Sequence, residues 1–239
     1  MSDPKPLVVA NLKANKTWQQ MSVWLDQIGN SSVVKSFSGT IIIAPSAPFL
    51  VAASQKIKSA NLPLKLSSQD VSKFEQGAYT GEYAASQIVD LCQYAIIGHS
   101  ERRKYFSETD RDIINKTKLL LDLGITPILC VSNLKQLDTY LEQGRIIIDN
   151  AAKIIFVYEP PSAISSGGAF RPENPEDANK NAGEIDKKIG QKVITLYGGS
   201  INKDNVHSFS SQGNINGGLV GQASIDPQVF IQVIKNSKK

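Results

Sequence analysis

The stretch Tyr94-Ala95-Ile96-Ile97-Gly98-His99-Ser100-Glu101-Arg102-Arg103 joins a short apolar run to a cluster of titratable side chains. The run from Tyr94 to Ile97 is typical of a parallel strand that is buried on both faces. An imidazole then stands at the C-terminal tip of the strand, and acidic and basic groups open the next element. A single histidine is more often structural than catalytic. The rest of the chain therefore decides what His99 does.

Similar apolar runs recur along the whole chain, and segments with helical periodicity separate them. We expect strands at Leu7–Asn11, Thr40–Ala44, Leu64–Gln69, Tyr94–Ile97, Thr126–Val131, Ile154–Tyr158, Val193–Tyr197 and Gly218–Val220. Repeats of about 30 residues, each a strand followed by a helix, are typical of a (β/α)₈ barrel. The sequence predicts one such α/β barrel of eight parallel strands, with residues 1–239 forming a single catalytic domain.

Capping residues mark where the helices between these strands begin. We expect helix starts at Trp18, Pro48, Thr80, Thr109, Asn133, Asn174-Pro175, Asn202 and Asp226-Pro227. An open doubly wound sheet is the alternative architecture, and it would show a G-x-G-x-x-G turn after the first strand. Asn11-Leu12-Lys13 stands there instead, which disfavours that alternative.

The composition is that of an ordinary globular protein, with 41% hydrophobic and 20% charged residues and a net charge of +4. Nothing in this charge pattern calls for a nucleic acid or a membrane as partner. No apolar run reaches the roughly 18 residues that a membrane span needs. Cys92 and Cys130 lie in or beside apolar stretches, so we expect both to be reduced and buried, as in a cytoplasmic protein.

In a parallel barrel, the active site lies where the strands end. Lys13, His99 and Glu159 all follow predicted strands, and so do the turns Gly198-Gly199-Ser200 and Gly221-Gln222. Glycine-bearing turns backed by helix starts can hold an anion such as phosphate. A carboxylate, an imidazole and a fixed cation suit proton abstraction next to a carbonyl. The spacing therefore favours acid–base chemistry on a small phosphorylated carbonyl compound.

Several blocks along the chain resemble the triosephosphate isomerase family in order and approximate spacing. They are Asn11-Leu12-Lys13, Gly98–Arg103, Tyr158-Glu159-Pro160, Tyr197-Gly198-Gly199-Ser200 and Leu219-Val220-Gly221. The second and third blocks are highly specific in combination. The resemblance implies interconversion of dihydroxyacetone phosphate and D-glyceraldehyde 3-phosphate, in glycolysis and gluconeogenesis, without a metal or other cofactor.

By this resemblance, Glu159 is the base that moves a proton between C1 and C2 of the substrate. His99 polarises the carbonyl as a neutral imidazole, since the start of a helix opposes its protonation. Lys13 supplies the ammonium that stabilises developing negative charge, and Asn11 orients the substrate. Glu101 is expected near Lys13 as a supporting partner.

The resemblance also implies a closing lid at Pro160–Ala169 and a phosphate held by the amides of Ser165, Ser200, Gly221 and Gln222. The loop Asp70–Thr80 would insert into a neighbouring subunit, with Thr80 reaching the partner's site, so a homodimer is expected.

The chain departs from the family pattern in places. The lid reads Pro161-Ser162-Ala163-Ile164-Ser165-Ser166-Gly167-Gly168, Gln222 stands where a glycine is usual, and Asp70 replaces a usual asparagine.

Two other functions are compatible with parts of the pattern. Another phosphate-binding barrel enzyme, acting on a different sugar phosphate, would share the turns at Gly198–Ser200 and Gly221-Gln222. The block around His99 favours triose isomerisation over it. A non-catalytic barrel is the other alternative, because fold alone does not determine function. The presence of Lys13, His99 and Glu159 together argues against it.

Overall fold

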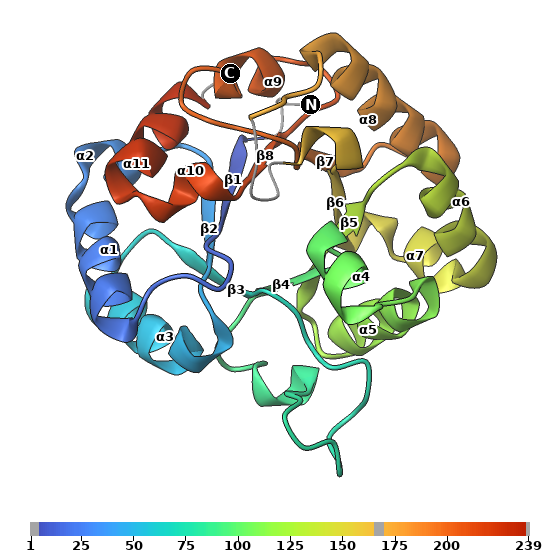
Figure 1. Cartoon of the computed structure of the whole chain (residues 1–239), viewed down its shortest axis with the longest axis horizontal. Coiled ribbons are helices and arrows are strands. Elements are labelled where there is room, and N and C mark those ends of the chain that lie inside the picture. Colours follow the sequence, from blue (N-terminus) through green and yellow to red (C-terminus); the bar gives the residue numbers. More distant parts are fainter. Residues whose placement is uncertain (1–4, 165–169, 238–239) are drawn as a thin grey trace.

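The computed structural model describes residues 5–164 and 170–237. Its strands form a closed parallel barrel in chain order, surrounded by helices (Figure 1). The strands are β1 (Leu7–Asn11), β2 (Thr40–Ala44), β3 (Lys65–Ser68), β4 (Tyr94–Ile97), β5 (Thr126–Val131), β6 (Ile155–Tyr158), β7 (Ile194–Tyr197) and β8 (Gly217–Val220). The predicted (β/α)₈ barrel is therefore confirmed.

Alternation along each strand divides the hydrophobic core into two layers. Leu7 and Val9 pack inside the barrel in one apolar cluster, whereas Val8 and Ala10 face the helices in a second. Ile155 and Val157 repeat the inward pattern on β6. Continuing this period of two beyond the packed interior brings Asn11 and Glu159 to the same rim of the barrel. The alternation that places apolar side chains inside the barrel thus also directs Asn11 and Glu159 toward the site.

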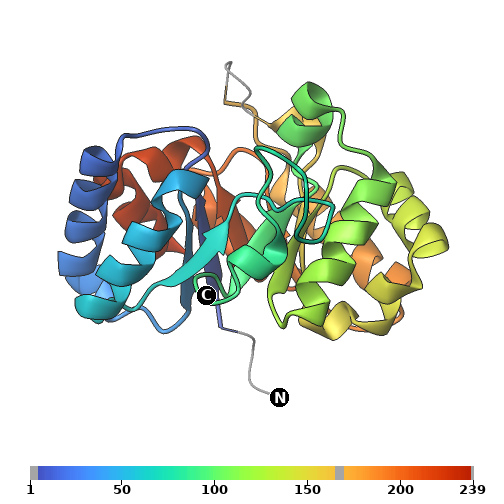
Figure 2. The same cartoon turned by 90° about the horizontal axis from the view of Figure 1, so that it is seen from below.

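The helices cover the outside of the strands, as Figure 2 shows from the side. They are α1 (Trp18–Asn30), α2 (Ser32–Lys35), α3 (Leu50–Ser59), α4 (Ser100–Phe106), α5 (Asp110–Asp122), α6 (Leu134–Gln143), α7 (Arg145–Asp149), α8 (Pro175–Ile189), α9 (Val206–Ser210), α10 (Gln222–Ile225) and α11 (Pro227–Asn236). The side chains of Thr109, Asn133, Asn174 and Asp226 cap α5, α6, α8 and α11 as predicted.

Two of the predicted helix starts are wrong. After Thr80 the chain forms only a 3₁₀ turn at Ala85–Gln87. Ala84 is extended just before this turn, and the carbonyl of Tyr83 accepts a hydrogen bond from the Ser72 amide. The backbone at Tyr83 and Ala84 therefore belongs to the loop and does not begin a helix. The helix predicted from Asn202 begins instead at Val206. The Asn202 side chain accepts hydrogen bonds from the amides of Asp204 and Asn205 and so caps the turn that precedes the helix.

The barrel closes through unequal seams. β8 pairs with β1 over four residue pairs but with β7 only at Tyr197 and Gly218. Asn216 reinforces the weak seam, since its side chain accepts the Thr195 amide hydrogen and its own amide donates to the Thr195 carbonyl. Gly217 has φ of 147°, and a Cβ there would lie 1.8 Å from the Leu7 carbonyl oxygen. Only glycine lets β8 approach β1 this closely.

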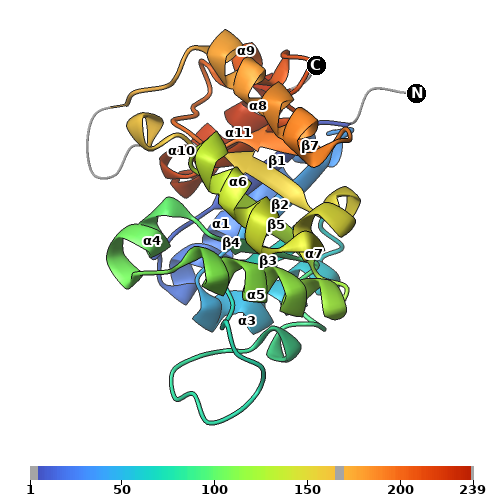
Figure 3. The ribbon, with the colours of Figure 1, turned by 90° about the vertical axis from the view of Figure 1, so that its right-hand side faces the viewer.

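The loop from Asp70 to Thr80 projects away from the barrel (Figures 1 and 3). Phe74 and Tyr79 stack on each other there, with ring centroids 4.2 Å apart, and both are exposed. Asp70 anchors the start of the loop. Its carboxylate lies 2.7 Å from Arg102 Nε and 2.7 Å from Lys116 Nζ. The loop is therefore held at its base and open to solvent at its tip.

The two cysteines, Cys92 and Cys130, are buried and unpaired, as predicted. Among residues 5–164 and 170–237, no helix is both long and apolar enough to cross a bilayer.

Candidate active site

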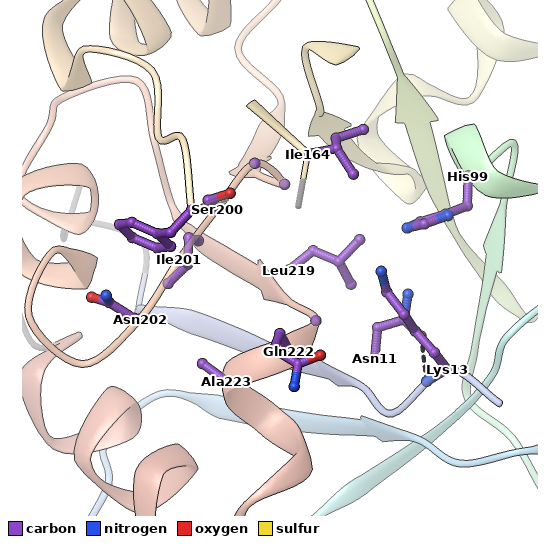
Figure 4. A pocket seen from close by; sticks show the side chains of 14 residues that line it. Asn11, Lys13, His99, Ile164, Ser200, Ile201, Asn202, Leu219, Gln222 and Ala223 are labelled. Atoms are coloured by element: carbon purple, nitrogen blue, oxygen red, sulfur yellow. Dashed lines mark hydrogen bonds between the residues drawn. The ribbon is translucent and has the colours of Figure 1, made fainter. Parts of the chain in front are cut away.

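A cavity of about 220 Å³ opens at the carboxyl ends of the strands (Figure 4). Its polar lining includes Asn11, Lys13 and His99, which lie together on one side, and the two predicted turns complete the wall. The described residues that line it are Asn11, Lys13, His99, Ile164, Phe170, Gly198, Gly199, Ser200, Ile201, Asn202, Leu219, Gly221, Gln222 and Ala223. The structure thus gathers residues from both ends of the sequence into one site.

Lys13 is held in the cavity by an unusual backbone conformation. Its φ of 50° lies in the left-handed region, which non-glycine residues occupy at a cost. The Asn11 side chain accepts a hydrogen bond from the Lys13 amide, and the Lys13 carbonyl accepts from Gln69 Nε2. The Lys13 ammonium lies 2.6 Å from Glu101 Oε1. This contact places Glu101 beside Lys13, as the resemblance implies.

His99 caps the N-terminus of α4 with its own ring. The Glu101 amide donates a hydrogen bond to His99 Nδ1 over 3.3 Å. Because Nδ1 accepts this hydrogen bond, Nε2 is the ring nitrogen that is left to donate. Nε2 lies 3.7 Å from Glu159 Oε2. The Nε2 edge of the ring therefore faces the Glu159 carboxylate.

Glu159 is completely buried behind His99 and lies outside the set of residues that line the cavity. Its Oε1 accepts a hydrogen bond of 2.7 Å from the Ser100 amide, whereas Oε2 has no hydrogen-bond partner among the described residues. Burial raises the pKa of Glu159, and the hydrogen bond from Ser100 acts in the opposite direction. A carboxylate with a raised pKa and one unpaired oxygen is suited to accept a proton.

The predicted phosphate-binding turns line the cavity, but one of their donors is engaged. The Ser200 amide and hydroxyl both donate to the Ala163 carbonyl, at 2.8 and 2.7 Å. Ala163 would therefore have to move before the Ser200 amide could hold a phosphate. Gly221 and Gln222 lie at the start of α10, where first-turn amides have no partner within the helix. Ser165, which was also predicted to bind phosphate, lies outside the described residues.

Apolar residues of the cavity wall escaped the sequence analysis as individual site residues. Ile164 belongs to the predicted lid, and Phe170 directly follows it. Leu219 is an inward-facing residue of β8 and closes the floor of the cavity. The alternation of β8 contains a signal for Leu219. No comparable signal marks Phe170, which is exposed.

These features bring a buried carboxyl group, an imidazole, a lysine ammonium and two glycine-bearing turns to one rim, an arrangement typical of barrel enzymes. In the described part of the chain, no three His, Cys, Asp or Glu side chains are grouped so as to hold a metal ion.

Comparison with known proteins narrows this class. Residues 6–237 match the family model described as triosephosphate isomerase. The chain is 33% identical over 251 residues to the triosephosphate isomerase of Endomicrobium trichonymphae, with 98% of this chain and 99% of that protein covered. It is 37% identical to the enzyme of the same name from Dictyostelium discoideum (87% of each chain) and 36% identical to that from Dictyoglomus thermophilum (97% and 99%). The chain belongs to the triosephosphate isomerase family.

Proposed function

We propose that this protein interconverts dihydroxyacetone phosphate and D-glyceraldehyde 3-phosphate, with Glu159 as base, His99 as proton donor and Lys13 as electrostatic stabiliser. The observation that carries the proposal is the approach of Glu159 Oε2 to His99 Nε2, at 3.7 Å, on the rim that also carries Lys13. Proton transfer between adjacent carbons needs a base and an acid on the same substrate.

The reaction follows from these roles. The Glu159 carboxylate removes a proton from C1 of dihydroxyacetone phosphate, and the electron pair forms the C1–C2 double bond. Negative charge develops on the oxygen at C2. This oxygen accepts a hydrogen bond from the Nε2–H of His99, and the Lys13 ammonium stabilises the charge. His99 gives its Nε2 proton to the oxygen at C2 and takes the hydroxyl proton from C1 in its place. Glu159 then returns its proton to C2 as the aldehyde forms at C1. A neutral imidazole suits this step because it is a weak acid, which can donate without trapping the intermediate.

Glu159 has to leave its present position to act. Its Oε1 is held by the Ser100 amide, and the side chain lies outside the cavity lining. Rotation away from Ser100 would bring the carboxylate past His99 and toward the cavity. We expect substrate binding to drive this rotation, together with the movement of Ala163 away from Ser200.

The phosphate is expected at Ser200, Gly221 and Gln222. Ser200 lies across the cavity from His99 (Figure 4), whereas Gly221 adjoins the Lys13 side chain. Asn11 lies beside Lys13, on the His99 side of the cavity, and fixes the Lys13 backbone through its side-chain oxygen. It is therefore placed to orient a substrate that spans the cavity.

A coupled assay tests this proposal directly. Purified protein is added to dihydroxyacetone phosphate, and a dehydrogenase that consumes D-glyceraldehyde 3-phosphate reports the product. We expect turnover at nanomolar enzyme. Absence of turnover at micromolar enzyme, with a folded sample, would refute the assignment.

We further propose that residues 1–239 act as one catalytic domain within a cytoplasmic homodimer. The unpaired state of Cys92 and Cys130 supports a reducing compartment. The projecting loop Asp70–Thr80, with exposed Phe74 and Tyr79, supports contact with a second copy of the chain. Thr80 lies exposed at the end of this loop, where it could reach the partner's site.

A further inference from the structure

Glu173 connects the ends of two barrel strands that lead into the site. It precedes Asn174, the capping residue of α8, and its carboxylate lies against Tyr158, the last residue of β6. Its backbone amide donates a hydrogen bond of 3.0 Å to the hydroxyl of Tyr197, the last residue of β7. One residue outside the cavity therefore contacts both tyrosines.

The Tyr158 hydroxyl is held from two sides. It donates to Glu173 Oε1 over 3.3 Å and accepts from Asn181 Nδ2 over 2.8 Å. Because the one hydrogen of Tyr158 goes to Glu173, Asn181 must be the donor in the second contact. This arrangement fixes the ring at the position directly before Glu159. The carboxylate of Glu173 is the acceptor on which the orientation of the ring depends.

The Tyr197 hydroxyl is confined as well. A Cβ at Gly199 would lie 2.2 Å from it, so the Gly198-Gly199 turn packs tightly on this ring. The other face of the ring stacks on Phe209, with centroids 4.0 Å apart. Tyr197 is therefore restrained without the Glu173 side chain, which leaves Tyr158 as the group that the carboxylate controls.

The Glu173 carboxylate is costly for the protein to hold in this place. Oε2 is buried and accepts no hydrogen bond from the described residues, and burial raises the pKa of the group. An unpaired buried oxygen of this kind lowers stability. Burial therefore disfavours the charged carboxylate here, and the hydrogen bond from Tyr158 is a contact that favours it.

We propose that Glu173 is a positioning residue for the isomerisation: by accepting the Tyr158 hydroxyl, it holds the end of β6 and thereby the backbone from which Glu159 reaches the substrate. Glu173 does not line the cavity, so it acts through Tyr158. The inference rests on the proposed function. It predicts that losing the acceptor oxygen slows the chemical step more than it weakens substrate binding.

The test compares Glu173→Ala, Glu173→Gln, Tyr158→Phe and the double variant Glu173→Ala/Tyr158→Phe. We expect Glu173→Ala to lower kcat about tenfold and to change KM by less than about twofold, since small displacements of a catalytic group are expensive. Glu173→Gln keeps an acceptor oxygen and should stay within about twofold of the unmodified kcat. Because both single changes break the same hydrogen bond between Tyr158 and Glu173, the double variant should be no slower than the slower single variant.

Glu176→Ala is the matched control, because Glu176 is an exposed acid in the first turn of α8. It should leave kcat unchanged. The inference is overturned if Glu173→Ala keeps the unmodified kcat, if Glu173→Gln is as slow as Glu173→Ala, or if the two single effects multiply. If Glu173→Ala does not fold, Tyr158→Phe decides alone. It removes the hydroxyl that Glu173 and Asn181 both contact, so unchanged kcat in that variant overturns the inference. Failure of the unmodified chain to turn over refutes the proposed function instead.

Discussion

Replacing Glu159 by aspartate would withdraw the carboxylate by about an ångström while keeping its charge. We expect kcat for dihydroxyacetone phosphate to fall by about 100-fold with little change in thermal stability, because proton transfer depends steeply on distance. The measurement is the coupled assay together with a melting curve. Glu176→Asp, the same change at an exposed position, serves as control. Near-full activity of Glu159→Asp would remove Glu159 from the role of base.

The raised pKa of Glu159 predicts the acidic side of the pH–rate profile. The proposed base acts when ionised, and burial raises the pKa of Glu159 above its ordinary value of 4.5. We therefore expect kcat/KM to fall, as the pH decreases, at a higher pH than an ordinary glutamate would give. The folded state also binds this proton more tightly than the unfolded chain, so ionisation of Glu159 lowers stability as the pH rises through the folded pKa.

Rates between pH 4 and 8 would check this, with circular dichroism over the same range to separate titration from unfolding. An acidic limb at or below 4.5 would contradict the prediction.

The sequence predicts which residues lie on the rim of the barrel better than it predicts the orientation of their side chains. The strand ends predicted that Lys13, His99 and Glu159 share one rim, because the barrel rule requires no knowledge of side-chain contacts. The hydrogen bond from the Ser100 amide holds the Glu159 side chain outside the cavity. It depends on the relative height of β4 and β6 and has no local signal in the sequence. The hydrogen bond from the Ser200 hydroxyl to the Ala163 carbonyl likewise has no local signal in the sequence, because it joins residues far apart in the chain.

At the scale of elements, an ion-pair cluster ties the projecting loop to α4 and α5. Asp70 at the loop base faces Arg102 of α4 and Lys116 of α5, with Glu108 from the connection between these helices also in contact with both bases. Tyr83, from the chain that returns from the loop, lies near Asp70 as well. Residues far apart in sequence thus meet in one buried cluster.

This cluster predicts a pH-dependent contribution to stability. Burial raises the pKa of Asp70 to about 6, with Glu108 adding to the rise and Lys116 and Arg102 opposing it. A carboxyl group whose pKa is higher in the folded than in the unfolded chain stabilises the fold at low pH. This contribution is lost as the pH rises through the folded pKa. We expect Asp70→Asn to remove this loss, so its melting temperature relative to the unmodified chain should rise between pH 5 and pH 7. A difference that is constant across this range would contradict the prediction.

Elements were predictable where local signals agree. The strand bounds were correct to within one residue, because each strand is a distinct apolar run between polar segments. The helix predicted after Thr80 is absent from the described residues. Ile88 and Leu91 have helical spacing, but Ala84 is extended and the Tyr83 carbonyl already accepts a hydrogen bond from within the loop. The cluster around Asp70 was not predicted, as Lys116 lies 46 residues away and no periodicity links the two.

At the scale of the whole molecule, the exposed rings of the projecting loop predict association. We expect sedimentation to give twice the chain mass of 26.0 kDa. Tyr79→Asp places a charge on the stacked pair of Phe74 and Tyr79 and should shift the mass toward that of one chain. Val23→Asp, a similar change at an exposed position on α1, should not. A single-chain mass for the unmodified protein at micromolar concentration would refute the dimer.

The unequal seams of the barrel have a consequence for synthesis. β8 closes the barrel at the end of the chain, and it does so through Gly217, the residue that lets it lie against β1. A nascent or cleaved chain that stops before this point has two bare edges, on β1 and β7, with backbone groups ready to pair with other chains. The barrel can therefore close only after β8 has been synthesised. Shortened products that lack β8 should aggregate instead of persisting as partly active barrels.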